Sequence, residues 1–250
     1  MTFSLASVLA GALAMATAGI LRGFTGFGTA LAGVPLLSLV FAPGLAVPTI
    51  MALQIVAGLQ NLYADNRHIE WRTLLRLLPG AVLGIVPGMG LLLWLRADTA
   101  RLAIGLIVIL TVLLLQRGWH LRKLPGFWAL LGLGGLSGVL NGLAAMAGPP
   151  IIALFFALRR PPEVTRASLA AFFLCNGTLG LALALAQGLI VLSDLWLAAL
   201  LCPAMILGTT LGGRLFTGDL RRHYRLVGLL ALLAVGLAAA GRGALGLWLG

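Results

Sequence analysis

The chain has 250 residues, of which 61% are hydrophobic and 9% are charged, and its mean hydropathy is +1.09. This composition excludes a protein that folds in water, because too few polar side chains are present to cover a solvated surface. The formal net charge of +11 fits loops that face anionic lipid, so we expect the lipid bilayer as a partner and no nucleic acid.

Long apolar runs recur along the chain, and short gaps between them hold most of the charged residues. A helix needs roughly 20 residues to cross a hydrocarbon core of about 30 Å. The sequence therefore predicts an all-α, polytopic membrane protein that forms one integral membrane domain. The ten predicted segments lie near residues 3–23, 28–42, 46–64, 71–95, 99–117, 124–144, 149–158, 164–188, 191–213 and 222–240.

The first segment ends in small residues, as a signal peptide does. No basic residue precedes it, and the chain needs it as the partner of residues 124–144. We therefore expect it to stay in the mature protein.

The chain contains an internal sequence repeat. GILRGFTGFGTALAGVP, residues 19–35, matches GVLNGLAAMAGPPIIAL, residues 138–154. We interpret this as a tandem duplication into a first transmembrane repeat, residues 1–118, and a second, residues 119–250, with five segments each. The aligned pairs are Gly19 with Gly138, Gly23 with Gly142, Pro43 with Pro162, Pro79 with Pro203, Gly84 with Gly208, and Gly88 with Gly212.

The distribution of basic residues predicts the topology. If all ten segments cross, only Arg96, Arg101 and Arg242 of the 17 Lys and Arg residues lie on the less basic side. The alternative of eight crossings, in which segments two and seven return to the side they came from, divides the basic residues more evenly. The positive-inside rule therefore favours ten crossings, with the basic side cytoplasmic and both termini periplasmic. Because five crossings is an odd number, the second repeat is inverted relative to the first.

Both repeats predict a broken helix at the midplane. A helix that starts near Lys123 reaches the far side by Ala144, and five extended residues, 145–149, return roughly 16 Å. The ten residues that end at Leu158 then form a half-helix of about 15 Å. By the repeat, Phe24 to Gly28 also returns, and a second half-helix begins near Thr29.

A helix N-terminus presents unpaired N–H groups and a partial positive charge. Two such termini meeting at mid-depth predict a binding site for a small anionic substrate. Proline at the start of a helix fixes where the second half-helix begins. The candidate donors are the amides of Phe27, Gly28, Thr29, Ala147 and Gly148 and the hydroxyls of Thr25 and Thr29, and the proline is Pro149.

Few other polar residues lie at membrane depth, and each is either functional or an interhelical hydrogen-bonding group. Gln54 and Asn176 are the preferred substrate-binding candidates, because each lies in the middle of the segment that follows a break. Arg22 lies where a cytoplasmic vestibule would be, or it is an interface arginine that reaches to water. The remaining polar residues at depth are Asn61, Asn141 and Gln187.

Other glycines are spaced for close helix contact, and we assign them to packing. They are Gly80, Gly84, Gly88, Gly134, Gly138 and Gly142.

The acidic residues and histidines all fall in predicted connections or in the first turn of a predicted segment. Cation-coupled carriers and proton relays usually have a carboxylate or imidazole at membrane depth, so a cation substrate is disfavoured. The chain has no nucleophile with a base, no HExxH or Walker motif and no cysteine cluster, so we expect no enzyme activity, no metal and no cofactor. Cys175 and Cys202 are interpreted as small buried hydrophobic residues.

The two glycine-rich runs resemble the paired signatures of the sulfite exporter TauE/SafE family, also called the 4-toluene sulfonate uptake permease family. The resemblance covers nearly the whole chain and includes Gly148 to Pro150. It implies passage of small sulfur-containing organic or inorganic anions, such as sulfite, sulfonate or sulfoacetate, across the bacterial inner membrane. The residues by themselves reach only as far as a small anion, and the alternatives are a carrier for another small anion and a non-transporting membrane scaffold. The direction of transport, the coupling ion and the oligomeric state, including a homodimer, stay open.

Overall fold

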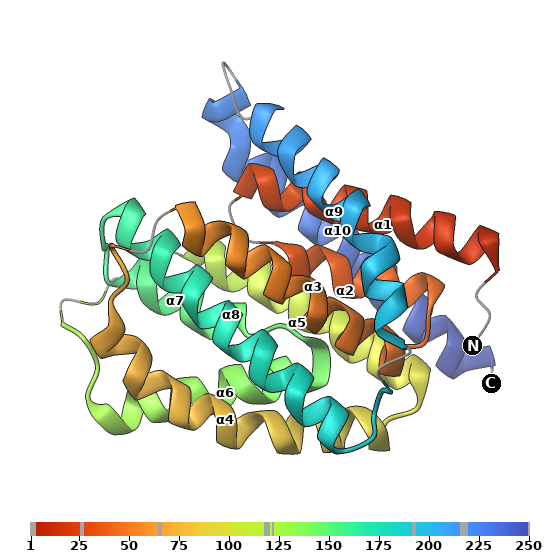
Figure 1. The fold of residues 1–250 in the computed structure, drawn as a ribbon, viewed down its shortest axis with the longest axis horizontal. Coiled ribbons are helices and arrows are strands. Elements are labelled where there is room, and N and C mark those ends of the chain that lie inside the picture. The colour runs from red at the N-terminus through yellow and green to blue at the C-terminus, as the bar shows by residue number, and fades with distance from the viewer. Residues whose placement is uncertain are drawn as a thin grey trace. The chain divides into compact units, whose positions relative to one another are not determined.

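The computed structural model describes residues 4–25, 28–64, 67–117, 121, 123–191, 194–215 and 220–249. Within these ranges the chain forms ten helices and no strand (Figure 1). They are α1 (Leu5–Thr25), α2 (Thr29–Val40), α3 (Pro43–Ala64), α4 (Trp71–Trp94), α5 (Ala97–Arg117), α6 (Phe127–Ala144), α7 (Gly148–Ala157), α8 (Pro162–Ala186), α9 (Leu195–Leu215) and α10 (Leu220–Leu249).

Every predicted segment corresponds to one of these helices. Eight of the described helices are long and apolar enough to cross a membrane, and the two exceptions are the helices predicted to be half-length, α2 with 12 residues and α7 with 10. Two predicted ends were wrong. Helix α1 includes Phe24 and Thr25, which were expected in a returning segment. Helix α10 continues to Leu249 instead of ending near residue 240, because the run beyond Arg242 is again apolar.

The outer surface of the helices carries the residues of a membrane protein. Leucines such as Leu9, Leu83 and Leu110 are more than half exposed, as expected for side chains that face lipid. Tryptophans lie at or near helix ends and are also exposed, with an exposed fraction of 83% for Trp94 and Trp248. Tryptophan concentrates at the two membrane–water interfaces. The chain is thus a multi-pass membrane protein. Its exposed tryptophans at or near helix ends are Trp71, Trp94, Trp128, Trp196 and Trp248.

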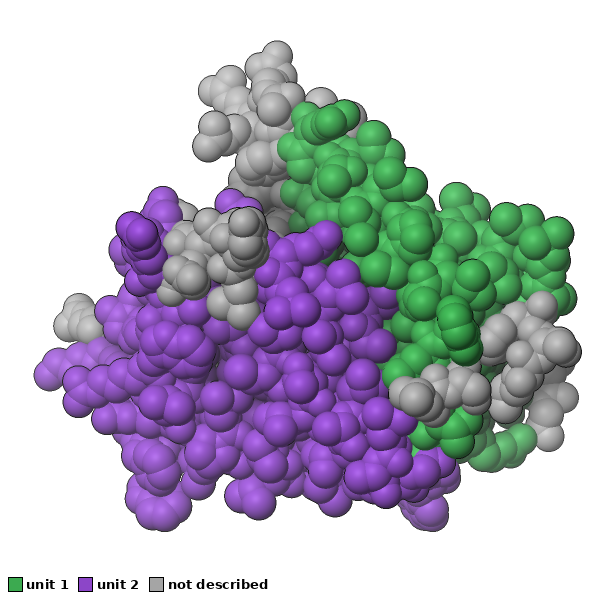
Figure 2. Space-filling model, in the orientation of Figure 1, with its two compact units in different colours: residues 1–50, 95–112, 189–250 green, residues 51–94, 113–188 purple. Residues whose placement is uncertain are grey.

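The chain divides into two compact units, coloured separately in Figure 2. Unit 1 consists of residues 1–50, 95–112 and 189–250, and unit 2 consists of residues 51–94 and 113–188. Each unit therefore takes helices from both proposed repeats. The boundary between residues 118 and 119 stays a prediction, because it divides the chain by sequence similarity and the units are defined by packing.

In unit 2, helix α4 packs along helix α6 with their backbones in contact. A Cβ atom on Gly80, Gly84 or Gly88 would overlap a carbonyl oxygen of α6, and one on Gly134, Gly138 or Gly142 would overlap a carbonyl oxygen of α4. A backbone atom cannot move aside as a flexible side chain does. The prediction that these glycines serve close helix packing is confirmed.

In unit 1, helices α1 and α9 cross in the same way. A Cβ atom on Gly19 or Gly23 would overlap the backbone of α9, and one on Gly208 or Gly212 would overlap the backbone of α1. These four glycines are the ones that the sequence aligns with Gly138, Gly142, Gly84 and Gly88. The first helix of each half of the chain thus packs on the fourth helix of the other half.

Each unit has its own apolar core around these crossings. The largest fully buried side chains are aliphatic or aromatic, so burial of apolar surface stabilises both units. They include Met15, Leu37, Ile50 and Ile104 in unit 1, and Leu74, Leu77, Ile85, Met89, Phe155 and Phe172 in unit 2.

Candidate functional site

The first break lies in unit 1, between α1 and α2. Helix α2 begins at Thr29, as predicted, and the buried residue before it, Gly28, has φ 151° and ψ −10°. Side chains other than glycine avoid this conformation. The Ala32 N–H donates to the Gly28 carbonyl over 2.9 Å, and no side chain among the described residues caps the helix. The N–H groups of the first turn of α2 are therefore directed out of the helix without an intrahelical acceptor.

Two polar side chains of unit 1 are buried near this break. Thr29 is 5% exposed and Arg22, in the last turn of α1, is 4% exposed. An arginine that reaches to the interface keeps its guanidinium in water, so this burial disfavours the interface interpretation. A buried charge inside a membrane span is by default a candidate for function.

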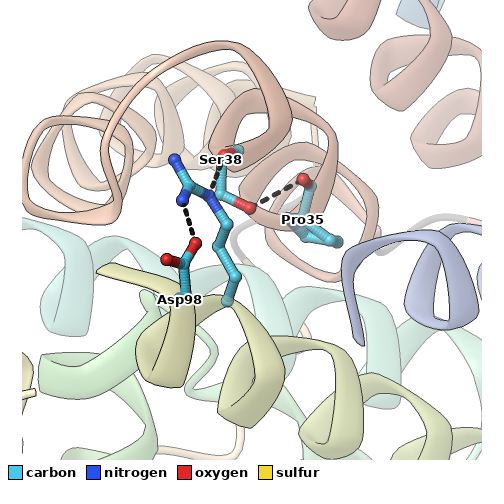
Figure 3. A network of polar contacts seen from close by, with 4 residues as sticks. Pro35, Ser38 and Asp98 are labelled. Atoms are coloured by element: carbon cyan, nitrogen blue, oxygen red, sulfur yellow. Dashed lines mark hydrogen bonds and ion pairs between the residues drawn. The ribbon is translucent and has the colours of Figure 1, made fainter. Parts of the chain in front are cut away.

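The opposite end of α2 is held by a polar network, shown in Figure 3. Arg101, on α5, donates from Nε to the Ser38 carbonyl over 2.8 Å and from Nη1 to Asp98 Oδ1 over 2.7 Å. The Ser38 hydroxyl donates to the Pro35 carbonyl over 2.8 Å. A cation at a helix C-terminus satisfies end carbonyls and complements the helix dipole. This network anchors the C-terminal end of α2 to α5.

Sequence reasoning assigned Arg101 no role. The sequence held only a weak indication that Arg101 bonds to α2. The last carbonyls of a half-helix need partners, and Arg101 lies near the start of a later helix. Only the tertiary contact identifies Arg101 as the basic residue that bonds to the C-terminal end of α2.

The second break lies in unit 2, between α6 and α7, and is shorter than predicted. Only Ala145–Ala147 lie outside the helices, so the expectation of five extended residues, 145–149, was wrong. Ala145 has φ 50° and ψ 24°, a left-handed conformation that reverses the chain direction at once. The Ala145 N–H donates to the Asn141 carbonyl over 2.6 Å and closes the end of α6.

The chain nevertheless returns along α6 as predicted. The Ser137 hydroxyl donates to the Ala147 carbonyl, and Ser137 precedes the end of α6 at Ala144 by about two turns, or roughly 10 Å of helix. Three residues of chain can cover about 10 Å. By Ala147 the chain has therefore doubled back to the level of Ser137.

The N-terminus of α7 offers fewer donors than that of α2. Its first residue, Gly148, is followed by Pro149 and Pro150, which have no N–H group. Gly148 does not have a positive φ. A Cβ atom there would lie 3.0 Å from Cδ1 of Ile152 and 3.5 Å from the ring of Phe173. The two glycines predicted to act alike thus have different physical constraints.

Buried polar side chains of unit 2 gather beside this second break. Gln54 Nε2 donates to the Ala145 carbonyl over 2.8 Å, and Asn141 Nδ2 donates to the Asn176 carbonyl over 3.0 Å. Asn176 Nδ2 donates to the Phe172 carbonyl over 3.2 Å. Asn141 and Asn176 are fully buried, and Gln54 is 6% exposed. Asn141, ranked below the other two from sequence, joins α6 to α8.

The predicted site residues therefore form two groups. Unit 1 holds Arg22, Gly28 and Thr29, and unit 2 holds Gln54, Ala147, Gly148, Pro149 and Asn176. Phe27 lies outside the described residues, and so do the side chains of Thr25 and Asn61. Gln187 is exposed at the end of α8, which removes it from the set at membrane depth.

The described acidic residues lie at helix starts or in connections. Asp98 and Glu163 are in the first turns of α5 and α8, not in connections as expected, and there they complement the helix dipole. In the part of the chain that the structure describes, no group of three or more His, Cys, Asp or Glu could hold a metal ion.

Comparison with known proteins identifies the family. The model of the family described as sulfite exporter TauE/SafE matches residues 11–239. The probable inner membrane transporter protein TsaS of Comamonas testosteroni is 28% identical over 203 residues, 77% of this chain and 79% of the relative. The probable sulfite/organosulfonate exporter TauE of Cupriavidus necator is 27% identical over 201 residues, 76% of this chain and 77% of the relative. No solved structure matches significantly. The chain belongs to the sulfite exporter TauE/SafE family of membrane transporters.

Proposed function

We propose that this protein is a secondary carrier for small sulfur oxyanions, of the sulfite or organosulfonate type, in the bacterial inner membrane. The observation that carries the anion preference is the buried Arg22, which lies in α1 shortly before the uncapped N-terminus of α2. A guanidinium and a helix N-terminus both favour negative charge. The name of the relative from Cupriavidus necator, a probable sulfite/organosulfonate exporter, supports the sulfur class.

The chemistry of the first break suits a pyramidal or tetrahedral group of oxygens. Hydrogen bonds to a charged group contribute about 1.5–3 kcal/mol each, and the planar guanidinium can bind two oxygens at once. We assign Arg22, Gly28 and Thr29 to the anion, with the undescribed Thr25 side chain and Phe27 amide as further candidates. In unit 2, Ala147 is the helix cap of α7 and Pro149 has no N–H group, so we assign neither of them to the anion.

Two contacts in unit 2 support the topology with ten crossings. Arg160 Nη2 lies 2.9 Å from Glu70 Oε1, which joins the connection before α4 to the connection after α7. The Leu121 N–H donates to the Ala157 carbonyl over 2.8 Å, which joins the connection before α6 to the end of α7. Ten crossings place all these connections on one side, the cytoplasmic one. Eight crossings would place the partners in each pair on opposite sides.

The reciprocal helix packing supports an inverted repeat. Helix α1 packs on α9 and helix α4 packs on α6, so the two crossings exchange the first and fourth helices of the halves. Inverted repeats with interrupted helices are typical of secondary carriers that alternate access. The family consists of transporters, and we propose no catalytic step for this chain.

Counterflow in proteoliposomes tests the proposal. The panel is labelled sulfite, organosulfonates, sulfate, carboxylates and amines. Wild-type protein should exchange sulfite or a sulfonate, and Arg22→Gln should lower the apparent affinity by about 10- to 150-fold, the equivalent of about 1.5–3 kcal/mol. Arg96→Gln is the matched control, since Arg96 is exposed in the connection between α4 and α5.

The alternatives predict other results. A scaffold would move nothing in the panel. A carrier for another anion would exchange sulfate or carboxylates in preference to sulfite and sulfonates. Exchange of amines alone would contradict an anion site. Equal affinity in the Arg22→Gln and wild-type proteins would remove Arg22 from the site.

A further inference from the structure

Two buried amide oxygens in unit 2 lack a hydrogen-bond partner among the described residues: Asn141 Oδ1 and Asn176 Oδ1. Both side chains are fully buried. Their orientations follow from their NH₂ groups, each of which donates to a backbone carbonyl. Turning either amide would place two oxygens against each other. An unsatisfied buried acceptor is unfavourable. We therefore expect these two oxygens to bind a ligand that carries a positive charge or donates hydrogen bonds.

The surroundings of the pair offer further acceptors and few donors. Asn141 lies in the last turn of α6, at the negative end of the helix dipole, and its side chain joins it to Asn176 of α8. The Leu140 and Asn141 carbonyls there accept the N–H groups of Met146 and Ala145. The helix that follows starts with a glycine and two prolines, so two of its first four N–H donors are absent. Gln54 Nε2, a third amide donor, is bonded to the Ala145 carbonyl. This environment favours a cation over an anion.

The repeat shows the same contrast between the two breaks. The alignment that sets Gly19 on Gly138 and Gly23 on Gly142 sets Arg22 on Asn141. The first break thus has a fixed positive charge at the position where the second has a neutral oxygen acceptor. The first break has the positive charge of Arg22, and at the second break the aligned residue, Asn141, has an oxygen that can bind a cation from solution.

We propose that Asn141 Oδ1 and Asn176 Oδ1, at the negative end of the α6 dipole, bind a monovalent cation, Na⁺. A set of neutral oxygens suits one positive charge, whereas divalent ions are usually held by carboxylates. A proton is excluded as the ligand, because an amide oxygen does not titrate in the physiological range. Carbonyls at helix ends are a recurrent way to bind Na⁺ in carriers with broken helices.

As a coupling ion, Na⁺ would offset the charge of a monovalent anionic substrate and so reduce the cost of moving that charge through a low-dielectric medium. This coupling role rests on the proposed function. The binding of Na⁺ to the protein does not.

The test measures Na⁺ binding without any substrate. Thermal unfolding of the purified protein is followed while NaCl replaces choline chloride or KCl at constant ionic strength. The wild-type melting temperature should rise with Na⁺ and saturate, as for a ligand that binds only the folded state. Asn141→Leu and Asn176→Leu should lose the response. Thr178→Val should keep it, because this hydroxyl, also on α8, bonds only to the Leu174 carbonyl of its own helix.

A second variant keeps the test informative if leucine prevents folding. Asn176→Asp adds a titratable oxygen at the same place, so its Na⁺ response should become pH-dependent and weaken on acidification, whereas the wild-type response should not depend on pH in this way. Equal melting temperatures in NaCl and choline chloride for the wild type would overturn the proposal and assign the two oxygens to water. An unchanged Na⁺ response in all three asparagine variants would also overturn it. Failure of sulfite exchange with an intact Na⁺ response would refute only the proposed function.

Discussion

Alanine at Gly28 should be far more damaging than alanine at Gly148, although both glycines flank a half-helix. Gly28 has φ 151° and ψ −10° and directly precedes α2. A residue held in such a sparsely populated region costs about 1–3 kcal/mol. If the backbone instead moves to relieve the strain, the first N–H groups of α2 change direction. The first response lowers the free energy of unfolding by that amount. The second requires substrate binding to restore the strained conformation, which lowers the apparent substrate affinity by up to about 5- to 150-fold.

At Gly148 the backbone imposes no such cost, because its φ is not positive. The nearest atom to a new Cβ is Cδ1 of Ile152 at 3.0 Å, the far end of a flexible side chain that can shift by a few tenths of an ångström. Alanine is also favoured over glycine in helices by roughly 0.5–1 kcal/mol. Gly148→Ala should therefore keep flux and stability near the wild-type values. Leucine at Gly28 should abolish transport, because a longer side chain blocks the approach of the anion to the backbone.

The assay is sulfite counterflow in proteoliposomes with matched protein content, with thermal unfolding of the same variants in detergent. The expected order is wild type, then Gly148→Ala, then Gly28→Ala in both measurements. Wild-type affinity and melting temperature for Gly28→Ala would refute the backbone argument. Equal losses in the two alanine variants would show that crowding by the new Cβ, and not φ, governs both positions.

Three further predictions follow from the topology, the packing and the polar cluster. Single cysteines introduced between Arg117 and Lys123 should be labelled from the cytoplasm and cysteines at both termini from outside, and a cytoplasmic C-terminus would rule out ten crossings. Gly138→Ala should lower the melting temperature by several degrees, because its Cβ would overlap the backbone of α4 and overpacking costs about 1–3 kcal/mol. Gly132, on the same helix, faces open space, so Gly132→Ala should leave the melting temperature unchanged. Equal melting temperatures for these two variants would contradict the packing argument. Gln54→Ala should raise the apparent substrate constant by no more than about tenfold, the value of one neutral hydrogen bond of about 0.5–1.5 kcal/mol; an unchanged constant in concentration-dependent uptake would limit Gln54 to holding the Ala145 carbonyl.

Much of the fold could be predicted because its signals are local. Apolar runs of roughly 20 residues identify membrane helices whatever surrounds them. Glycine and proline interrupt those runs at residues 26–28 and 148–150, so the two short helices could be recognised, and the start of α2 was placed at Thr29. Because the two halves align, the break predicted in the second half also predicted the break in the first half. The glycine spacing on α4 and α6 indicated close packing without saying what would be packed against them.

The partners themselves depend on which helices meet, and that is not local. The sequence did not indicate that α4 packs on α6, that Arg101 bonds to the end of α2, or that Asn141 bonds to Asn176. Each contact joins separate helices, and the two hydrogen bonds join residues that are 63 and 35 positions apart. It also missed the left-handed turn at Ala145, because alanine carries no turn signal and adopts this conformation only where packing and hydrogen bonds enforce it. Composition and periodicity determined how many helices form and where they break. The tertiary contacts alone decided that one break has a buried guanidinium, and that the other has two amide oxygens without a hydrogen-bond partner in the described part of the chain.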